Sequence, residues 1–275
     1  MGSVSEGSCM VRSSREPEHG ESMSDPVPPR PDQPHSMVPE GPERQKSTWR
    51  WWEAIGVYVV VFLASNVVAV PLLLAIHPTG LANLVASAAV AIVIVGLLLL
   101  WLSRYHPGWR TAVGFPRRPW PEVGAGVLFG AALYPVIVLG VGLALTAIFQ
   151  AVSGHSVRAP RQLPTHLSAV GVGVSVVYAV VIAPIHEELF FRGMLFRSIR
   201  DNYGFGAGAV GSGLAFGLIH YVPGTALGTL LLMSVMVFTG IGLAYVYEKR
   251  GNIVATLVAH ATFNVIGLIL IYALD

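Results

Sequence analysis

Charged residues are scarce in this sequence, and cysteine is almost absent. Only 12% of the 275 residues are charged and 53% are hydrophobic, whereas soluble domains carry about 25% charged residues. This shortage excludes an ordinary water-soluble enzyme, and the apolar content excludes a chain that is disordered throughout. A single cysteine, Cys9, excludes an internal disulfide, a cysteine-rich zinc site and a redox-active cysteine pair. The apolar share therefore predicts a membrane protein.

A strongly basic surface is also missing, because 17 basic and 15 acidic residues leave a net charge of only +2. This balance argues against a nucleic-acid partner. Residues 1–48 hold 13 of these charges and eight of the 19 prolines, so we expect a disordered, proline-rich tail there. No apolar run follows the first basic residues, and we expect no signal peptide.

From Trp49 onward the sequence consists mainly of apolar runs. A membrane-spanning helix needs about 20 mostly apolar residues. We expect an all-α, polytopic membrane helix bundle, with N-terminal membrane helices in residues 49–119 and a helical core in residues 120–275. Seven runs qualify, at residues 53–76, 81–103, 122–152, 167–200, 205–222, 225–247 and 252–274.

Aromatic and basic residues at the ends of these runs predict an orientation. Trp49, Trp51 and Trp52 have the position of an interfacial aromatic belt. Basic residues mark the cytoplasmic ends of membrane helices. They follow the second, fourth and sixth runs, at Arg104, Arg110, Arg117, Arg118, Arg197, Arg200, Lys249 and Arg250. We therefore expect an integral protein of the inner or plasma membrane, with its N-terminus in the cytoplasm and its C-terminus outside.

The run 167–200 is too long for a straight crossing. As a helix it would measure about 51 Å, against a hydrocarbon core of about 30 Å. Pro184 predicts a kink, because it removes one backbone hydrogen bond and leaves the carbonyl of Val180 unpaired. Within a membrane such a carbonyl is tolerated only inside a protein or beside water.

Polar residues stand out in the fourth, fifth and seventh runs, and ionisable groups inside a membrane are functional candidates by default. Glu188 and Arg192 are four residues apart with the acid first, which favours an ion pair, and we interpret them as a structural clamp. Glu187 is rotated by about 100° from Glu188 and has no local partner. Two further pairs each share a helix face, Phe216 with His220 and His260 with Asn264.

In chain order these residues read Glu187-Glu188-x-x-x-Arg192, Phe216-x-x-x-His220 and His260-x-x-x-Asn264. The pattern resembles the three signature motifs of the CAAX protease and bacteriocin-processing (Abi) family of intramembrane proteases, which includes the type II CAAX prenyl endopeptidases. The likeness covers roughly residues 120–275. It implies a helical protease core with a polar cavity that opens towards the cytoplasm or within reach of its leaflet.

The resemblance also implies roles for the motif residues. Glu187 would be the catalytic carboxylate and would activate water together with His220. Glu188 and Arg192 would be structural. His260 and Asn264 would complete the site and stabilise the oxyanion. The partners would be the lipid bilayer and a peptide, lipidated or membrane protein substrate, although no residue shows that the substrate is prenylated.

Two chemistries remain open for the site. Without a metal, Glu187 supplies the base and Asn264 an amide donor for the oxyanion. Alternatively, Glu187, His220 and His260 could hold zinc and leave a fourth position open. The sequence has no HExxH motif, because no histidine stands four residues after His186. We favour hydrolysis without a cofactor and retain zinc as the alternative.

An intramembrane endopeptidase is thus the favoured function. A non-catalytic immunity or scaffold protein could use the same bundle to bind a partner. A transporter would be expected to show an internal repeat or paired broken helices, and the sequence has no clear repeat.

Overall fold

The computed structural model describes residues 46–76, 80–163 and 167–274. Within these ranges all regular structure is helical and no strand is present, which confirms the all-α prediction. The tail predicted at residues 1–48 lies outside the described residues except for its last three positions. Its disorder therefore stays a prediction.

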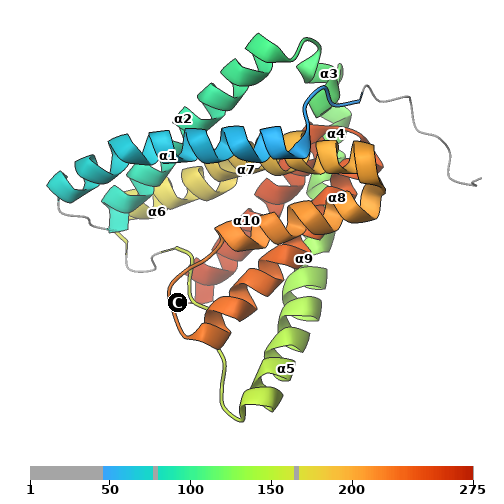
Figure 1. Cartoon of the computed structure of the whole chain (residues 1–275). Helices are drawn as coiled ribbons and strands as arrows, with labels where there is room; N and C mark the ends of the chain where they lie inside the picture. The colour runs from blue at the N-terminus through green and yellow to red at the C-terminus, as the bar shows by residue number, and fades with distance from the viewer. Residues whose placement is uncertain (1–45, 77–79, 164–166, 275) are drawn as a thin grey trace, which may run out of the picture. The chain divides into compact units, whose positions relative to one another are not determined.

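Ten α-helical segments and three π-helical segments follow one another along the described chain (Figure 1). The π-helical segments, η1 to η3, have i→i+5 hydrogen bonds and continue the α-helices beside them without a loop. The segments are α1 (Trp51–Ile76), α2 (Gly80–Tyr105), α3 (Trp109–Val113), α4 (Trp120–Tyr134), η1 (Pro135–Gly142), α5 (Leu143–Ser153), α6 (Ala169–Val177), η2 (Tyr178–Ile182), α7 (Ala183–Glu188), η3 (Leu189–Phe196), α8 (Arg197–Ile219), α9 (Ala226–Arg250) and α10 (Ile253–Leu274).

Six helical runs in the described part of the chain are long and apolar enough to cross a membrane, where the sequence predicted seven. The difference lies in one run of 51 residues, Ala169–Ile219, which joins the runs predicted at 167–200 and 205–222. It contains a sharp bend at Gly204, whose backbone (φ 84°, ψ 172°) favours glycine. The two predicted runs are therefore parts of one helical run that bends at Gly204, and no loop separates them.

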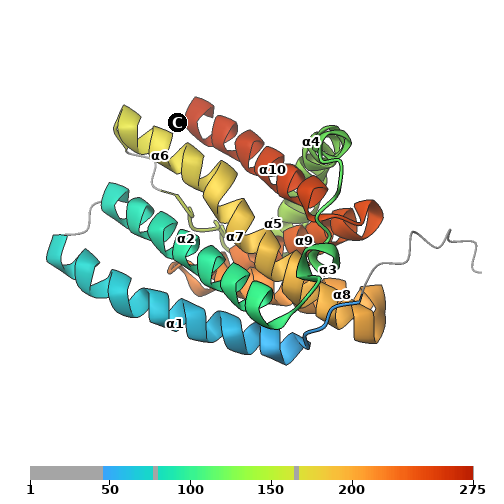
Figure 2. The same ribbon diagram turned by 90° about the horizontal axis from the view of Figure 1, so that it is seen from above.

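The long helices lie next to one another in a defined order. Figure 2 shows α1, α2, the α6–α7 run and α10 side by side. On the other side of α10 lies α4, and α8 packs against α9. The run that carries Glu187 therefore lies between α2 and α10.

The helix ends that carry basic residues meet at one end of the bundle. The Tyr247 hydroxyl near the end of α9 donates a hydrogen bond to the Val113 carbonyl of α3 at 2.6 Å. The Arg250 guanidinium donates two hydrogen bonds of 2.9 Å to the Glu122 carboxylate at the start of α4. These contacts join the end of α9 to the segment that follows α2, as expected if both face the same membrane surface.

Trp49 does not belong to the aromatic belt that the sequence predicted. Its side chain is only 1% exposed, and its indole N–H donates to the Met194 carbonyl in η3 at 3.0 Å. Trp51 and Trp52 remain exposed at the start of α1. Trp49 differs because the chain turns it inwards, where it anchors the entry to α1 against η3.

Two glycines allow α4 and α10 to approach closely. A Cβ atom on Gly126 would lie 2.7 Å from the Ala255 carbonyl oxygen, and one on Gly130 would collide with the Ala259 carbonyl oxygen. Small residues spaced by four along a helix are a common means of close helix packing in membranes. This contact positions α10, and with it His260 and Asn264.

We predict that Gly130→Ala destabilises the protein by about 1–3 kcal/mol, because the added methyl group overpacks the contact with α10. Thermal unfolding in detergent measures this change. Gly124→Ala on the same helix is the matched control, since a Cβ atom there meets nothing within 4 Å. Equal unfolding midpoints for the two variants would show that the α4–α10 contact is not tight.

Candidate active site

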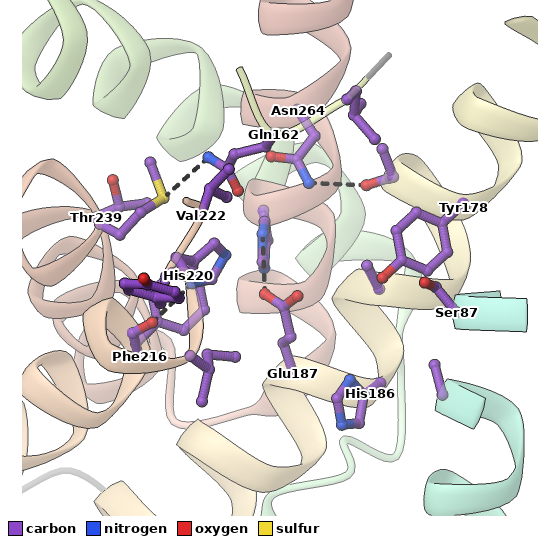
Figure 3. A pocket seen from close by; sticks show the side chains of 18 of the residues that line it. Ser87, Gln162, Tyr178, His186, Glu187, Phe216, His220, Val222, Thr239 and Asn264 are labelled. Atoms are coloured by element: carbon purple, nitrogen blue, oxygen red, sulfur yellow. Dashed lines mark hydrogen bonds and ion pairs between the residues drawn. The ribbon is translucent and has the colours of Figure 1, made fainter. Parts of the chain in front are cut away.

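A cavity of about 810 Å³ lies among α1, α2, the α6–α7 run, α8, α9 and α10. Its lining includes all four residues for which the sequence predicted a catalytic role, Glu187, His220, His260 and Asn264. Figure 3 shows three of them, Glu187, His220 and Asn264, around a common space. Helices that are distant in the sequence thus bring the polar motif residues together.

Glu187 lies in α7 and is 9% exposed. Its Oε2 atom has no hydrogen-bond partner in the described part of the chain. The Nε2 atom of His260 lies 3.8 Å from this oxygen. Glu187 therefore lines the cavity, with one carboxylate oxygen buried beside His260 and left without a hydrogen-bond partner.

Glu188 and Arg192 form a fully buried ion pair, with 3.2 Å between Glu188 Oε2 and Arg192 Nε. Arg192 Nη2 also donates to the Gly240 carbonyl of α9 at 3.3 Å. The guanidinium lies over the ring of Phe216, 4.7 Å from its centroid. Arg192 thus neutralises Glu188 and contacts both α8 and α9, which fits a clamp between helices.

His260 is oriented by the second oxygen of the Glu188 carboxylate. Its Nδ1 atom lies 2.8 Å from Glu188 Oε1. An ionised carboxylate only accepts hydrogen bonds, so Nδ1 carries the proton and Nε2 of the neutral ring is an acceptor. Glu188 therefore sets the tautomer of His260 and directs its Nε2 atom towards Glu187.

His220 follows the last turn of α8, and its Nδ1 atom lies 2.7 Å from the Phe216 carbonyl oxygen. A carbonyl also only accepts, so the remaining nitrogen of neutral His220 is an acceptor. The ring packs on Phe216, with 4.5 Å between centroids. No ring nitrogen of His220 reaches ion-pair distance of the Glu187 carboxylate among the described contacts, whereas His260 does.

The Asn264 amide donates to the Ala179 carbonyl of η2 at 2.7 Å. Ala179 stands five residues before Pro184, which has no N–H to offer in an i→i+5 pattern. The sequence predicted the unpaired carbonyl at Val180, four residues before the proline. The π-helical turn moves it by one residue, and Asn264 supplies the missing donor.

Three cavity residues did not stand out in the sequence. The Tyr58 hydroxyl of α1 lies 3.1 Å from His186 Nε2, and Tyr178 of η2 lines the same space. Tyr178 precedes Glu187 by nine residues, a rotation of about 900° in an α-helix, which puts the two on opposite faces. The wide π-helical turn of η2 changes the angle between the two side chains around the helix axis. No local sequence pattern indicated that turn.

The three residues that could hold zinc do not converge. Among the described residues, no group of three His, Cys, Asp or Glu side chains is placed to bind one metal ion. Glu187 and His260 lie 3.8 Å apart, and no contact of His220 with either the Glu187 carboxylate or the His260 imidazole is found within the described part of the chain. In this arrangement Glu187, His220 and His260 do not form a three-ligand zinc site.

We predict that Glu188→Gln destabilises the protein by about 3–5 kcal/mol, because Arg192 keeps a buried charge without its counter-ion. Thermal unfolding in detergent measures the loss. Glu122→Gln is the control, since its partner Arg250 is 36% exposed and pairs of that kind contribute about 0–1 kcal/mol. The clamp interpretation fails if both variants unfold at the wild-type temperature.

One family model matches this part of the chain. Residues 169–266, which run from α6 to the middle of α10, match the family described as type II CAAX prenyl endopeptidase Rce1-like. Neither a curated protein nor a solved structure matches the chain significantly. The matched residues include the Glu187 carboxylate, His220, His260 and Asn264. The region that holds the site is therefore similar to the type II CAAX prenyl endopeptidase Rce1-like family.

Proposed function

We propose that this protein is a membrane-embedded endopeptidase in which Glu187 activates a water molecule. The observation that carries the proposal is the Glu187 carboxylate itself, which lines the cavity and whose buried Oε2 atom lies beside His260 without a hydrogen-bond partner. A base must lie within hydrogen-bond reach of the water that it deprotonates. The cavity beside Glu187 supplies that position.

The reaction consumes one water molecule. Its oxygen bonds to the scissile carbonyl carbon while one of its protons passes to Glu187, and the carbonyl π electrons move to the oxygen. The tetrahedral intermediate then collapses as the C–N bond breaks. The leaving nitrogen takes the proton from Glu187, and the products are a carboxylic acid and an amine.

His260 supports this proton transfer from behind Glu187. Its Nε2 atom is an acceptor 3.8 Å from Glu187 Oε2, and the two atoms would share the proton that Glu187 receives once they approach to hydrogen-bond distance. Glu188 would stabilise the resulting imidazolium through Nδ1–H, as the buried carboxylate of a catalytic triad does. His220 offers its Nε2 atom as a second acceptor for water or for the amine.

We further propose a peptide, lipidated or membrane protein as the substrate, reached from the bilayer. The family match favours a prenylated peptide with a C-terminal CAAX sequence as the first substrate to test. The basic helix ends favour an inner or plasma membrane location with the N-terminus in the cytoplasm.

We predict that Glu187→Gln lowers kcat by about 100- to 10,000-fold, because the amide cannot take the proton from water. The measurement is cleavage of a fluorescence-quenched, farnesylated CAAX peptide and a set of unprenylated membrane peptides by purified protein. Glu122→Gln serves as the control for loss of a carboxylate far from the cavity. A Glu187→Gln variant that cleaves at the wild-type rate would exclude this mechanism and leave a binding or scaffold function.

We predict that prolonged dialysis against a strong zinc chelator leaves the cleavage rate unchanged, because the three candidate ligands do not converge. Metal content is measured by elemental analysis in the same samples. Loss of activity on dialysis that is restored by stoichiometric zinc would instead support the zinc mechanism with Glu187, His220 and His260.

A further inference from the structure

This inference rests on the proposed function and concerns the oxygen of the scissile carbonyl. Hydrolysis converts that oxygen into an oxyanion, which enzymes stabilise with preorganised hydrogen-bond donors. Neutral His220 and His260 cannot serve, because the proton of each lies on Nδ1 and is already donated. His220 donates to the Phe216 carbonyl, and His260 donates to Glu188. Other residues must supply the donors.

Asn264 can supply one donor. A side-chain amide carries two N–H hydrogens, and one of them is used in the bond to the Ala179 carbonyl. The second hydrogen remains for a ligand, since Asn264 lines the cavity. An oxyanion held by one donor alone is weakly stabilised, so a second donor is needed nearby.

Tyr178 has the properties of that second donor. Its hydroxyl makes no hydrogen bond within the described part of the chain, and its side chain lines the cavity. Figure 3 shows it directed into the cavity on the opposite side of Glu187 from His220. Tyr58 also lies near Glu187, but its hydroxyl is already bonded to His186.

One hydrogen bond positions both donors. Tyr178 is the first residue of η2, and Asn264 binds the carbonyl of the next residue, Ala179. The bond that occupies one Asn264 hydrogen therefore also fixes the backbone that carries Tyr178. Pro184 makes this carbonyl available, because it has no N–H of its own.

We propose that the Tyr178 hydroxyl is a catalytic oxyanion donor, acting together with the remaining N–H of Asn264. Both donors keep their protons throughout the reaction. As water adds to the carbonyl carbon and its proton moves to Glu187, the carbonyl oxygen gains the electron pair and accepts the two hydrogen bonds. When the C–N bond breaks, the electron pair returns to form the new carboxyl group.

The test is Tyr178→Phe, which removes the hydroxyl and keeps the ring. The full-length protein is assayed with the farnesylated CAAX peptide and with an analogue whose scissile amide is replaced by a phosphinate. We expect kcat to fall by about 100-fold, the loss typical of one oxyanion donor. Because the donor acts mainly in the transition state, KM should stay within about threefold. The affinity for the phosphinate should fall with kcat.

Tyr134→Phe is the matched control, since it removes another hydroxyl that borders the cavity. The Tyr134 ring packs on Phe263 of α10 at 5.0 Å, and its hydroxyl lies beside Gly267. We expect kcat, KM and phosphinate affinity to equal those of the wild type.

The outcomes separate this inference from the proposed function. If Glu187→Gln abolishes cleavage while Tyr178→Phe changes neither kcat nor phosphinate affinity, the role of Tyr178 is excluded and the protease function stands. If Tyr178→Phe lowers the unfolding temperature and raises KM as much as it lowers kcat, Tyr178 is only structural. A wild-type protein that neither cleaves the peptide nor binds the phosphinate overturns both proposals.

Discussion

The fully buried carboxylate of Glu188 organises the site, because its two oxygens serve two different partners. One oxygen pairs with Arg192, and the other accepts the Nδ1–H of His260. A carboxylate at this depth would be very costly alone. Arg192 offsets this cost by pairing with the carboxylate. The negative charge of Glu188 in turn fixes the tautomer of His260. The orientation of the groups around Glu187 therefore depends on a residue that does not itself face the substrate.

Phe216 extends this arrangement to the second motif. Its ring lies under the Arg192 guanidinium and against the rings of His220 and His260. Its backbone carbonyl accepts the Nδ1–H of His220. One apolar residue thus positions a cation and two imidazoles, which explains why an aromatic side chain stands four residues before His220.

The π-helical turn before Pro184 is the second structural requirement of the site. A proline within a helix leaves a carbonyl without its usual donor, and Asn264 satisfies that carbonyl from α10. The helix that carries Glu187 is thereby tied to the helix that carries His260. The close approach of α4 to α10 through Gly126 and Gly130 supports α10 from its other side. The π-helical turn and the small residues of α4 thus help to set where the polar side chains of this bundle meet.

Composition and spacing alone determined that this chain is a helical membrane protein and which of its polar residues are functional candidates. Charge scarcity makes the few buried ionisable groups conspicuous, and the spacing of Glu188 and Arg192 follows directly from the α-helical period. Local patterns could not show that His260, rather than His220, lies beside Glu187, because that depends on how α7, α8 and α10 pack. They also could not place Tyr178 in the cavity. Its position depends on a change of helical phase in η2, and only contacts between distant segments, such as Asn264 with Ala179, hold that change in place.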